Sequence, residues 1–485
     1  MKRLSISPLY IFLSVHTVVW TLLPYFCRRI LPMDSLEAIV WGGFWEFGTN
    51  KHPPLSGFLL YPFYEMLAES PISVYLLSQI CIVIGFIYIY KLASCFISKQ
   101  KAVLATMMME GVVYYTVTSA EYNVNIVSLA LYPVNVYYFY QSLKYNRIKD
   151  WSLFGIASAL NILNKYVSGV LFVPMLAYVL FTKEGRSVFG KVGAYFAVCL
   201  AVLLCLPHLW WLCHYDFYTL SYFVGRTDGK VAEIFLNYPV LKHIAYPVKF
   251  AGGLLLAGLS SILLYILAFY NAKKEPSSVV DKYNKDKKFV LIMGMGPAVT
   301  CLLISLISGI YLKSMWGTPC LYMLTIMLFV CFPRLLIKPV YIIRNVYIFM
   351  VIMALVAAGI YLGTSSYRVW LNGKAFADEM QKVWYEENPE KPFAYVGGDI
   401  WLTSIVSLYA DDRPVAVAVK PDNVPWLSME DIFAKGALVL AFSEEECKLF
   451  SQYAEVQKKF PLKSTNYFGK TKEKDAFICF LKQKL

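Results

Sequence analysis

The sequence predicts an α-helical polytopic membrane protein with a small α/β domain at its C-terminal end. Of the 485 residues, 58% are hydrophobic and only 16% are charged, whereas soluble domains carry about a quarter charged residues. Apolar windows long enough to cross about 30 Å of hydrocarbon recur about eleven times. The chain changes character after Thr364. We therefore expect a membrane domain over residues 1–363 and an exported soluble domain over residues 364–485.

The predicted spans follow one another along the membrane domain. They lie near residues 8–30, 71–90, 102–118, 122–143, 151–165, 167–182, 192–212, 247–270, 289–312, 316–333 and 343–363. The fifth and sixth windows are short and can form one broken helix pair. The first window follows a basic start, and no small-residue cleavage site comes after it, so we expect an uncleaved signal anchor.

The formal net charge of +13 is concentrated in the predicted membrane domain. From Thr364 onward the chain has 16 Lys and Arg and 17 Asp and Glu, which leaves 29 and 15 in the first 363 residues. Loops on the N-terminal side of the membrane carry most of these cations, so the positive-inside rule puts the N-terminus in the cytoplasm. An odd number of spans then exports the C-terminal domain. Because no RNA- or DNA-reading motif is present, we expect membrane lipids and no nucleic acid as partners.

The first exported loop, residues 31–70, holds the densest group of reactive side chains. Asp34 and Glu37 are three residues apart, so in a helix their carboxylates share a face. The loop adds aromatic residues suited to a membrane–water boundary and two basic side chains. These are Trp41, Trp45, Phe47, Lys51 and His52. The carboxylates can simply solvate an interfacial helix, but their apolar neighbours would desolvate the pair, which favours a functional role.

The predicted topology brings further polar residues to the same outer face. They are Glu121, Asn123, Lys165, Tyr166, Arg226, Lys313 and Trp316. Each also has an ordinary structural interpretation: Glu121 and Asn123 can cap the next helix, and Lys165 can extend its amine to the membrane surface. We treat the whole set as candidate site residues because all of them converge on one face.

Glu110 lies inside the predicted span 102–118. An acid within the membrane is costly, and it marks a functional site unless neighbouring groups satisfy it. Hydroxyl groups of Tyr114, Tyr115 or a nearby threonine are the candidate partners.

The exported domain alternates predicted helices and strands. Residues 373–388 and 399–410 favour helices, whereas 392–398, 415–419, 436–442 and 477–482 favour strands, a pattern typical of an α/β domain. Ser428 with Asp431 and Ser443 with Glu446 fit capping boxes. The domain has no glycine-rich phosphate loop, so we do not expect nucleotide binding. Cys447 and Cys479 can form a disulfide in an oxidising compartment or remain two buried thiols.

Several motifs resemble one family of membrane enzymes. Asp34-x-x-Glu37-Ala with a following Trp-Gly, and then Lys51-His-Pro-Pro-Leu55, resemble the first exported loop of family 39-like glycosyltransferases. These are relatives of the protein O-mannosyltransferases and of the lipid A aminoarabinose and galacturonic acid transferases. Further motifs are similar to that group's later signatures. They are Glu121-Tyr-Asn-x-Asn125, Trp151-x-x-x-Gly155, Lys165-Tyr166, Pro207-x-x-x-Trp211 and Trp316-Gly-x-Pro319. One departure is that the two acids are separated by two residues, whereas they are adjacent in the mannosyltransferases.

The resemblance implies a GT-C fold and an inverting transfer of a sugar from a polyprenyl-phosphate donor to an envelope glycolipid, such as lipid A, or a related acceptor. It implies that Asp34 is the catalytic base, and Glu37 would orient a substrate. The expected donor phosphate partners are Lys51, Lys165, Arg226 and Lys313, and the expected substrate contacts are His52, Glu121, Asn123, Tyr166 and Trp316.

The chemistry requires no cofactor. Asp34, Glu37 and His52 can also hold a divalent metal, but the cations can replace it. The implied location is a bacterial inner membrane with a periplasmic active face. A polyprenyl-phosphate-linked lipid flippase is the alternative, which Glu110 favours, although we find no internal repeat typical of transporters.

Overall fold

The computed structural model describes residues 7–221, 238–269, 273–274, 286–332, 335–336, 338–418, 424–449 and 454–481. It divides into two compact units. Unit 1 comprises Met1–Thr21, Lys51–Leu55 and Leu76–Leu355, and unit 2 comprises Leu22–Asn50, Ser56–Tyr75 and Val356–Leu485. The first exported loop thus falls mostly in the same unit as the C-terminal domain, a grouping that the sequence did not predict.

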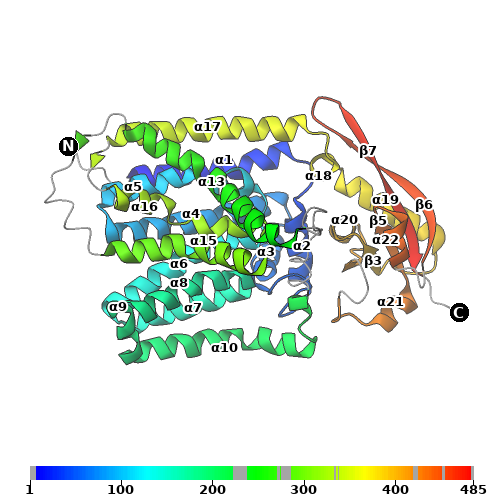
Figure 1. Ribbon diagram of the computed structural model, residues 1–485. Coiled ribbons are helices and arrows are strands. Elements are labelled where there is room, and N and C mark those ends of the chain that lie inside the picture. The colour runs from blue at the N-terminus through cyan, green and yellow to red at the C-terminus, as the bar shows by residue number, and fades with distance from the viewer. Residues whose placement is uncertain are drawn as a thin grey trace. The chain divides into compact units, whose positions relative to one another are not determined.

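Unit 1 is a bundle of helices (Figure 1). Its longer elements, including those that cross into unit 2, are α1 (Ser7–Cys27), α4 (Pro71–Phe96), α5 (Lys99–Met108), α6 (Val124–Tyr145), α7 (Ile148–Asn164), α8 (Gly169–Phe181), α10 (Val192–His214), α13 (Lys242–Phe269), α15 (Lys287–Ser308), α16 (Leu324–Cys331) and α17 (Pro339–Gly363). Shorter elements connect them: α9 (Lys183–Arg186), the 3₁₀ segments η1 (Met109–Gly111), η2 (Val113–Tyr115), η3 (Val117–Ala120), η4 (Tyr166–Ser168), η5 (Ser187–Gly190), η6 (Pro239–Leu241) and η8 (Ser314–Leu321), and the paired strands β1 (Lys273–Lys274) and β2 (Leu335–Leu336).

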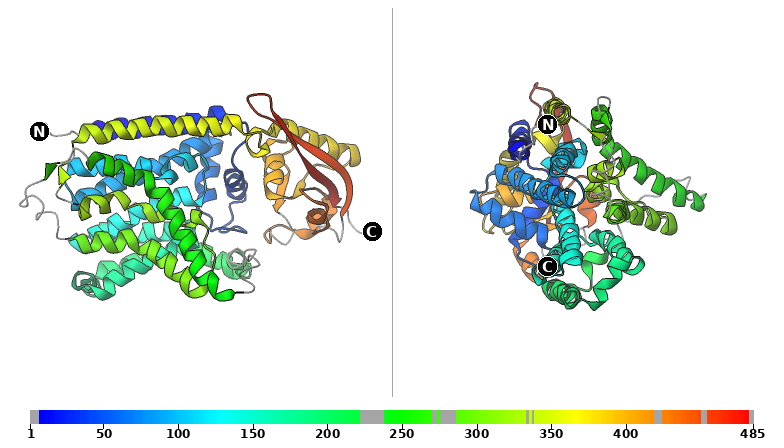
Figure 2. Two further views of the ribbon diagram at one scale, coloured as in Figure 1. Left: turned by 45° about the horizontal axis from the view of Figure 1, so that its top comes forward. Right: turned by 90° about the vertical axis from the view of Figure 1, so that its left-hand side faces the viewer.

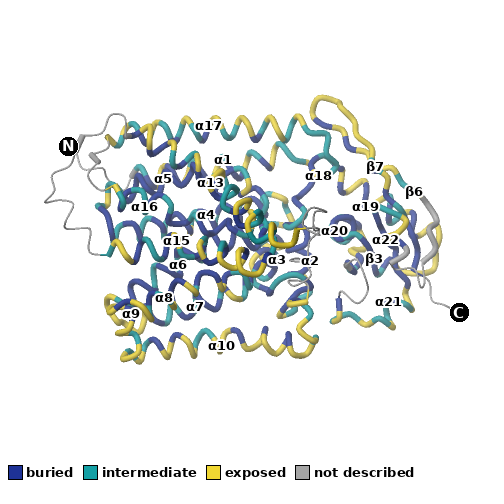
Figure 3. Tube along the Cα trace, viewed as in Figure 1, coloured by how far each residue is buried: buried dark blue, intermediate teal, exposed yellow. Residues whose placement is uncertain are grey.

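Six of the described helices are long and apolar enough to cross a membrane, and up to eight spans result if each bent pair is one span. The sequence had predicted about eleven. The difference arises at windows that do form helices, such as α7, which has only 17 residues, and at two pairs bent by 92° and 49°. Helices α10 and α17 are largely exposed along their length (Figure 3), as expected for helices that face lipid.

The window 102–118 does not form the predicted continuous helix. α5 ends at Met108, and the chain continues through η1, η2 and η3 as far as Ala120. At Gly111 an added Cβ atom would lie 2.6 Å from the backbone nitrogen of Ser261, and the Ser261 hydroxyl donates to the carbonyl oxygen of Met108 at 2.8 Å. The break is therefore set by close packing against α13, which local sequence does not reveal.

Unit 2 contains α2 (Met33–Gly43), α3 (Leu55–Met66) and the α/β domain. The domain's helices are α18 (Tyr367–Trp370), α19 (Gly373–Glu387), α20 (Ile400–Tyr409), α21 (Met429–Lys435) and α22 (Glu444–Leu449), and its strands are β3 (Tyr395–Gly398), β4 (Val415–Ala418), β5 (Ala437–Ala441), β6 (Ala454–Thr465) and β7 (Thr471–Leu481). The predicted elements are present, and β6 is an additional strand. Both predicted capping serines, Ser428 and Ser443, accept hydrogen bonds from the third residue that follows.

The sheet of unit 2 has the strand order β4-β3-β5-β7-β6. β3 pairs in parallel with β4 and β5, whereas β7 pairs antiparallel with β5 and β6. The two long strands β6 and β7 form a twisted ribbon at the edge (Figure 2). Every residue of β3 and β5 is buried, as expected for strands covered on both faces.

Alternate residues of β7 face two different layers of helices. Cys479 joins the core cluster that includes Ile432 of α21 and Cys447 of α22, whereas Phe480 lies against Trp384 of α19 with ring centroids 6.1 Å apart. Cys447 and Cys479 are bonded as a disulfide, which settles the alternative left open by the sequence.

Candidate active site

The acid pair lies on α2 of unit 2. Pro32 occupies the N-cap position and Asp34 lies in the first turn, where the partial positive charge of a helix N-terminus favours a carboxylate. The helix ends at Gly42 and Gly43. A Cβ atom on Gly42 would lie 2.5 Å from the carbonyl oxygen of Gly57 in α3. Because glycine lets α2 and α3 cross this closely, it fixes the position of the helix that carries the acids.

Asp34 and Glu37 share a helix as predicted, but their exposure differs. Glu37 is 2% exposed, whereas Asp34 is half-buried. Every residue from Ser35 to Gly42 is buried, so α2 packs inside the protein, whereas Trp45 and Phe47, which follow it, are 54% and 44% exposed. Trp41, expected at a membrane boundary, is 7% exposed. A carboxylate retained in such surroundings favours a function over simple solvation.

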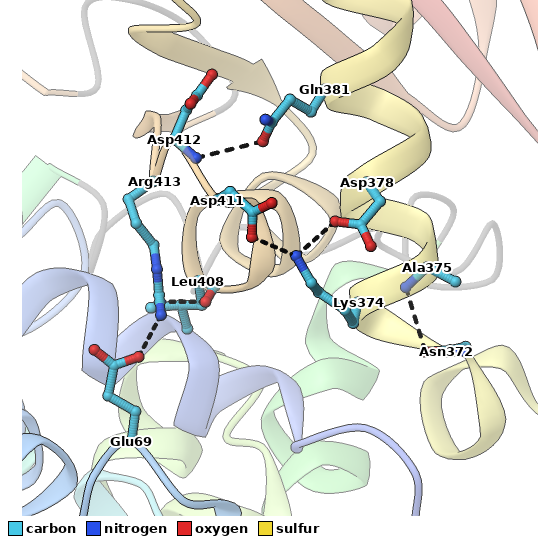
Figure 4. A network of polar contacts seen from close by, with 10 residues as sticks. All are labelled: Glu69, Asn372, Lys374, Ala375, Asp378, Gln381, Leu408, Asp411, Asp412 and Arg413. Atoms are coloured by element: carbon cyan, nitrogen blue, oxygen red, sulfur yellow. Dashed lines mark hydrogen bonds and ion pairs between the residues drawn. The ribbon is translucent and has the colours of Figure 1, made fainter.

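Helix α2 packs against the α/β domain inside unit 2. It contacts α20, and Phe44, which follows α2, lies edge-on to Trp426 with ring centroids 5.8 Å apart. The segment after α3 is also tied to this domain. Figure 4 shows the Arg413 guanidinium between the carboxylate of Glu69 and the carbonyl oxygen of Leu408. The α/β domain thus supports the loop that carries the acid pair.

Lysine 165 is the most deeply buried of the predicted phosphate partners that the structure describes. It lies at the break between α7 and η4, is 8% exposed, and donates from Nζ to Oδ1 of Asn125 at 2.6 Å. Its Nζ atom lies 5.9 Å from the ring centroid of Trp316. Three motifs far apart in the sequence therefore meet inside unit 1. Asn125 belongs to one of those motifs but was not among the predicted site residues. Only its hydrogen bond to the buried Lys165 indicates a role in the site.

Tyrosine 166 has a partner that the sequence analysis did not select. Its hydroxyl lies 2.7 Å from Nε2 of His208, and the two rings are stacked. His208 is 2% exposed and also stacks on Trp211. Its position directly after Pro207, in a motif already noted, was the available signal. The pair adds a part-buried hydroxyl–imidazole contact next to Lys165 in the chain.

The remaining candidates have more ordinary positions. Asn123 is the N-cap of α6, because its side chain accepts from the backbone nitrogens of Asn125 and Ile126, and this is the structural role weighed for it. Half-buried positions are found for Lys51, His52, Glu121 and Lys313. Arg226 lies outside the described residues. Among the described residues, no group of three or more His, Cys, Asp or Glu side chains is arranged to hold a metal ion.

Glu110 is satisfied inside unit 1, but not by the hydroxyl groups that the sequence suggested. Its two carboxylate oxygens contact Nδ1 of His16 at 2.6 Å and Nε1 of Trp20 at 2.9 Å. Glu110 and His16 are fully buried and Trp20 is 1% exposed. The buried acid therefore links α1 to the point where α5 breaks.

Comparison with known proteins supports the predicted fold. Residues 51–211 match the family model of the dolichyl-phosphate-mannose-protein mannosyltransferases. No curated protein matches the chain by sequence. Two crystal structures of ArnT from Cupriavidus metallidurans are similar over nearly the whole chain. The apo structure has a TM-score of 0.63 at 10% identity and covers 97% of each chain. The structure bound to undecaprenyl phosphate has a TM-score of 0.59 at 10% identity and covers 98% of each chain.

The chain has the GT-C fold of membrane glycosyltransferases. The predicted fold class is thereby confirmed, and the family model match over residues 51–211 agrees with the motif resemblance. This GT-C protein keeps the polytopic helical domain and the C-terminal domain in the order that the sequence predicted, while the roles of its individual site residues stay predictions.

Proposed function

We propose that this GT-C protein is an inverting glycosyltransferase that moves a sugar from a polyprenyl phosphate to a hydroxyl or phosphate group of an envelope glycolipid. The observation that carries the proposal is the buried Lys165, held by Asn125 beside Trp316. A cation in a largely buried position interacts strongly with an anion, and a donor phosphate is a suitable anion. The similar ArnT structure, which is bound to undecaprenyl phosphate, supports this class of donor.

The transfer needs one base and stabilisation of one leaving group. Asp34 takes the proton from the acceptor hydroxyl as its oxygen attacks the anomeric carbon of the sugar. The bond from that carbon to the phosphate oxygen breaks, and polyprenyl phosphate departs as an anion. Lys165 stabilises the charge that develops on the phosphate. A single displacement inverts the anomeric centre, and the transition state resembles an oxocarbenium ion.

The other candidates have supporting roles in this proposal. Glu37 orients a substrate from its buried position on α2, and Lys51 and Lys313 supply further positive charge. Tyr166, positioned by His208, contacts the donor. Because a phosphate leaves as a stable anion, no general acid is needed.

We further propose that these cations make a metal unnecessary. Treatment with EDTA should leave the transfer rate unchanged, because Lys165, Lys51 and Lys313 neutralise the phosphate. Loss of activity in EDTA that added Mg²⁺ or Mn²⁺ restores would contradict this.

The base assignment is tested by Asp34→Asn in purified protein reconstituted with a polyprenyl-phosphate sugar. The variant should insert and fold normally but lose transfer, since the amide cannot accept the proton. Glu37→Gln should lose less if Glu37 only orients a substrate. Glu65→Gln, which changes an exposed acid on the neighbouring α3, is the matched control. Full activity of Asp34→Asn would eliminate Asp34 as the base.

The acceptor and the compartment need a separate experiment. We propose the bacterial inner membrane, with the N-terminus in the cytoplasm and the C-terminal domain in the periplasm. Mass spectrometry of envelope glycolipids from cells with and without the active protein should reveal one mass difference equal to a sugar residue. An unchanged glycolipid profile together with altered surface polymer or protein glycans would move the proposal to those acceptors.

The flippase alternative makes a different prediction. Purified protein in vesicles would then move labelled polyprenyl phosphate across the bilayer without transferring a sugar. Since Glu110 is bound by His16 and Trp20, the residue that favoured transport has a structural explanation. Transfer without translocation would exclude the flippase.

A further inference from the structure

The turn that joins β6 and β7 presents two adjacent aromatic side chains to the surroundings. Tyr467 and Phe468 are 70% and 71% exposed, and their rings lie edge to face with centroids 5.5 Å apart. Single exposed aromatic residues need no explanation. An exposed aromatic pair at the tip of a two-stranded ribbon does need an explanation, because turns usually carry polar residues.

The turn is held in one conformation by Asn466. The Asn466 Oδ1 atom accepts from the backbone nitrogens of Phe468 at 3.1 Å and Lys470 at 2.9 Å, and its backbone nitrogen donates to the carbonyl oxygen of Lys470 at 3.0 Å. Gly469 has a φ of +79°, which glycine adopts without strain. Hydrogen bonds therefore hold the turn in a conformation that exposes both aromatic side chains.

The same asparagine ties the turn to the end of a membrane-spanning helix. Its Nδ2 atom donates to the carbonyl oxygen of Gly363 at 3.0 Å, and the hydroxyl of Ser464 donates to the carbonyl oxygen of Ser365 at 2.8 Å. Gly363 is the last residue of α17. Figure 1 shows the β6–β7 turn beside this end of α17.

The end of α17 marks a membrane boundary. The most apolar 18-residue window of this helix has a mean hydropathy of 2.3 and only 17% of that window is buried, so the helix faces lipid along most of its length. At 1.5 Å per residue such a helix is long enough to cross about 30 Å of hydrocarbon. The turn at Gly363 thus lies where the chain leaves the hydrocarbon for the headgroup region.

We propose that Tyr467 and Phe468 insert into the headgroup–hydrocarbon boundary and anchor the α/β domain to the membrane surface. Aromatic side chains concentrate at this depth. The exposed Lys470 and Lys472 follow the pair in the chain and suit the phosphates of anionic lipids. The occupant of this surface is the lipid bilayer beside α17, and the proposal does not depend on the transferred sugar.

Photo-crosslinking of the full-length protein in nanodiscs of phosphatidylethanolamine and phosphatidylglycerol tests the depth of the turn. Benzoylphenylalanine is placed at Phe468 in one sample and, as the control, at Tyr385, which is 37% exposed on α19 of the same domain. Mass spectrometry should find at least ~5-fold more lipid adduct on the peptide containing position 468, because only that site meets the interface. Equal adduct at both sites would overturn the proposal.

Thiol labelling provides a second measurement that needs no lipid adduct. Phe468→Cys and Tyr385→Cys are treated in nanodiscs with a membrane-impermeant maleimide, and the labelled peptides are quantified separately from those of the native cysteines. Relative to its rate after denaturation, position 468 should react about 10-fold more slowly than position 385, because the interface shields it. Equal relative rates in nanodiscs would overturn the proposal, as would shielding that appears only when other envelope proteins are added, since this would identify a protein partner.

Discussion

At the scale of the residue, Lys165 is the cation whose surroundings most restrict its role. Lys165→Met keeps the length of the side chain but removes the charge that Asn125 holds in place. We expect the transfer rate to fall about 100-fold or more, the range found when one group that stabilises developing charge is removed. Steady-state kinetics in nanodiscs would measure this.

Lys149→Met is the matched control for that prediction, because Lys149 is exposed in the first turn of α7 and should tolerate the change. Lys165→Arg should retain part of the activity through its charge. A Lys165→Met variant with unchanged kcat and donor KM would show that the buried amine serves only packing.

Single residues also show where sequence reasoning reached its limit. The motif Glu121-Tyr-Asn-x-Asn125 was recognised, yet Asn123 is the helix cap and Asn125 is the partner of Lys165. Both are asparagines near one helix start, and only tertiary contact distinguishes them. The same holds for Glu110, which contacts His16 and Trp20, 94 and 90 residues earlier in the chain.

At the scale of the element, the crossing of α2 and α3 controls the position of the acid pair. In Gly42→Ala the added methyl group would meet Tyr61 Cβ at 2.3 Å and the Gly57 carbonyl oxygen at 2.5 Å, so α2 must shift. A displacement of about 1 Å at a catalytic group can cost about 100-fold in rate. We expect a loss of this order in an assay of sugar transfer, with the protein still inserted.

The adjacent Gly43→Ala is the control, because its nearest contact would be the Tyr61 ring at 3.2 Å, and this side chain can adjust. The prediction fails if the two alanine variants are equally active. Equal losses in both would mean that the helix end needs glycine for its own conformation.

Elements were predictable where their signals are local. The helices and strands of the α/β domain follow from residue periodicity and from the caps at Ser428 and Ser443. The break after Met108 was not predictable, because it depends on Ser261 in α13. The burial of α2 was missed for a related reason: Trp41, its aromatic residue, suits an interface and an interior equally well.

At the scale of the whole molecule, the fold class followed from composition, hydropathy and the change of character at Thr364. The number of spans did not follow from the sequence, because the predicted span 102–118 is broken and other predicted spans are bent. The orientation argument relied on an odd number of spans, whereas the described residues contain six helices, or up to eight with the bent pairs, that are long and apolar enough to cross a membrane. The loop cations and the disulfide of the α/β domain therefore carry the proposal that this domain is exported, because disulfides persist in oxidising compartments.

The disulfide between Cys447 and Cys479 gives that proposal a measurable consequence. The bond joins α22 to β7 across 32 residues of sequence, and a loop of this size is worth roughly 3–4 kcal/mol to folding. Reducing agent should lower the melting temperature of the α/β domain and leave that of the unit 1 helices unchanged. Hydrogen exchange of the backbone amides in the sheet measures the melting of the domain. The Cys447→Ala/Cys479→Ala variant should melt at the lower temperature with or without reductant. If protein isolated from cells, with thiols trapped at lysis, contains both cysteines in the free form, the domain lies in a reducing compartment and the proposed orientation is wrong.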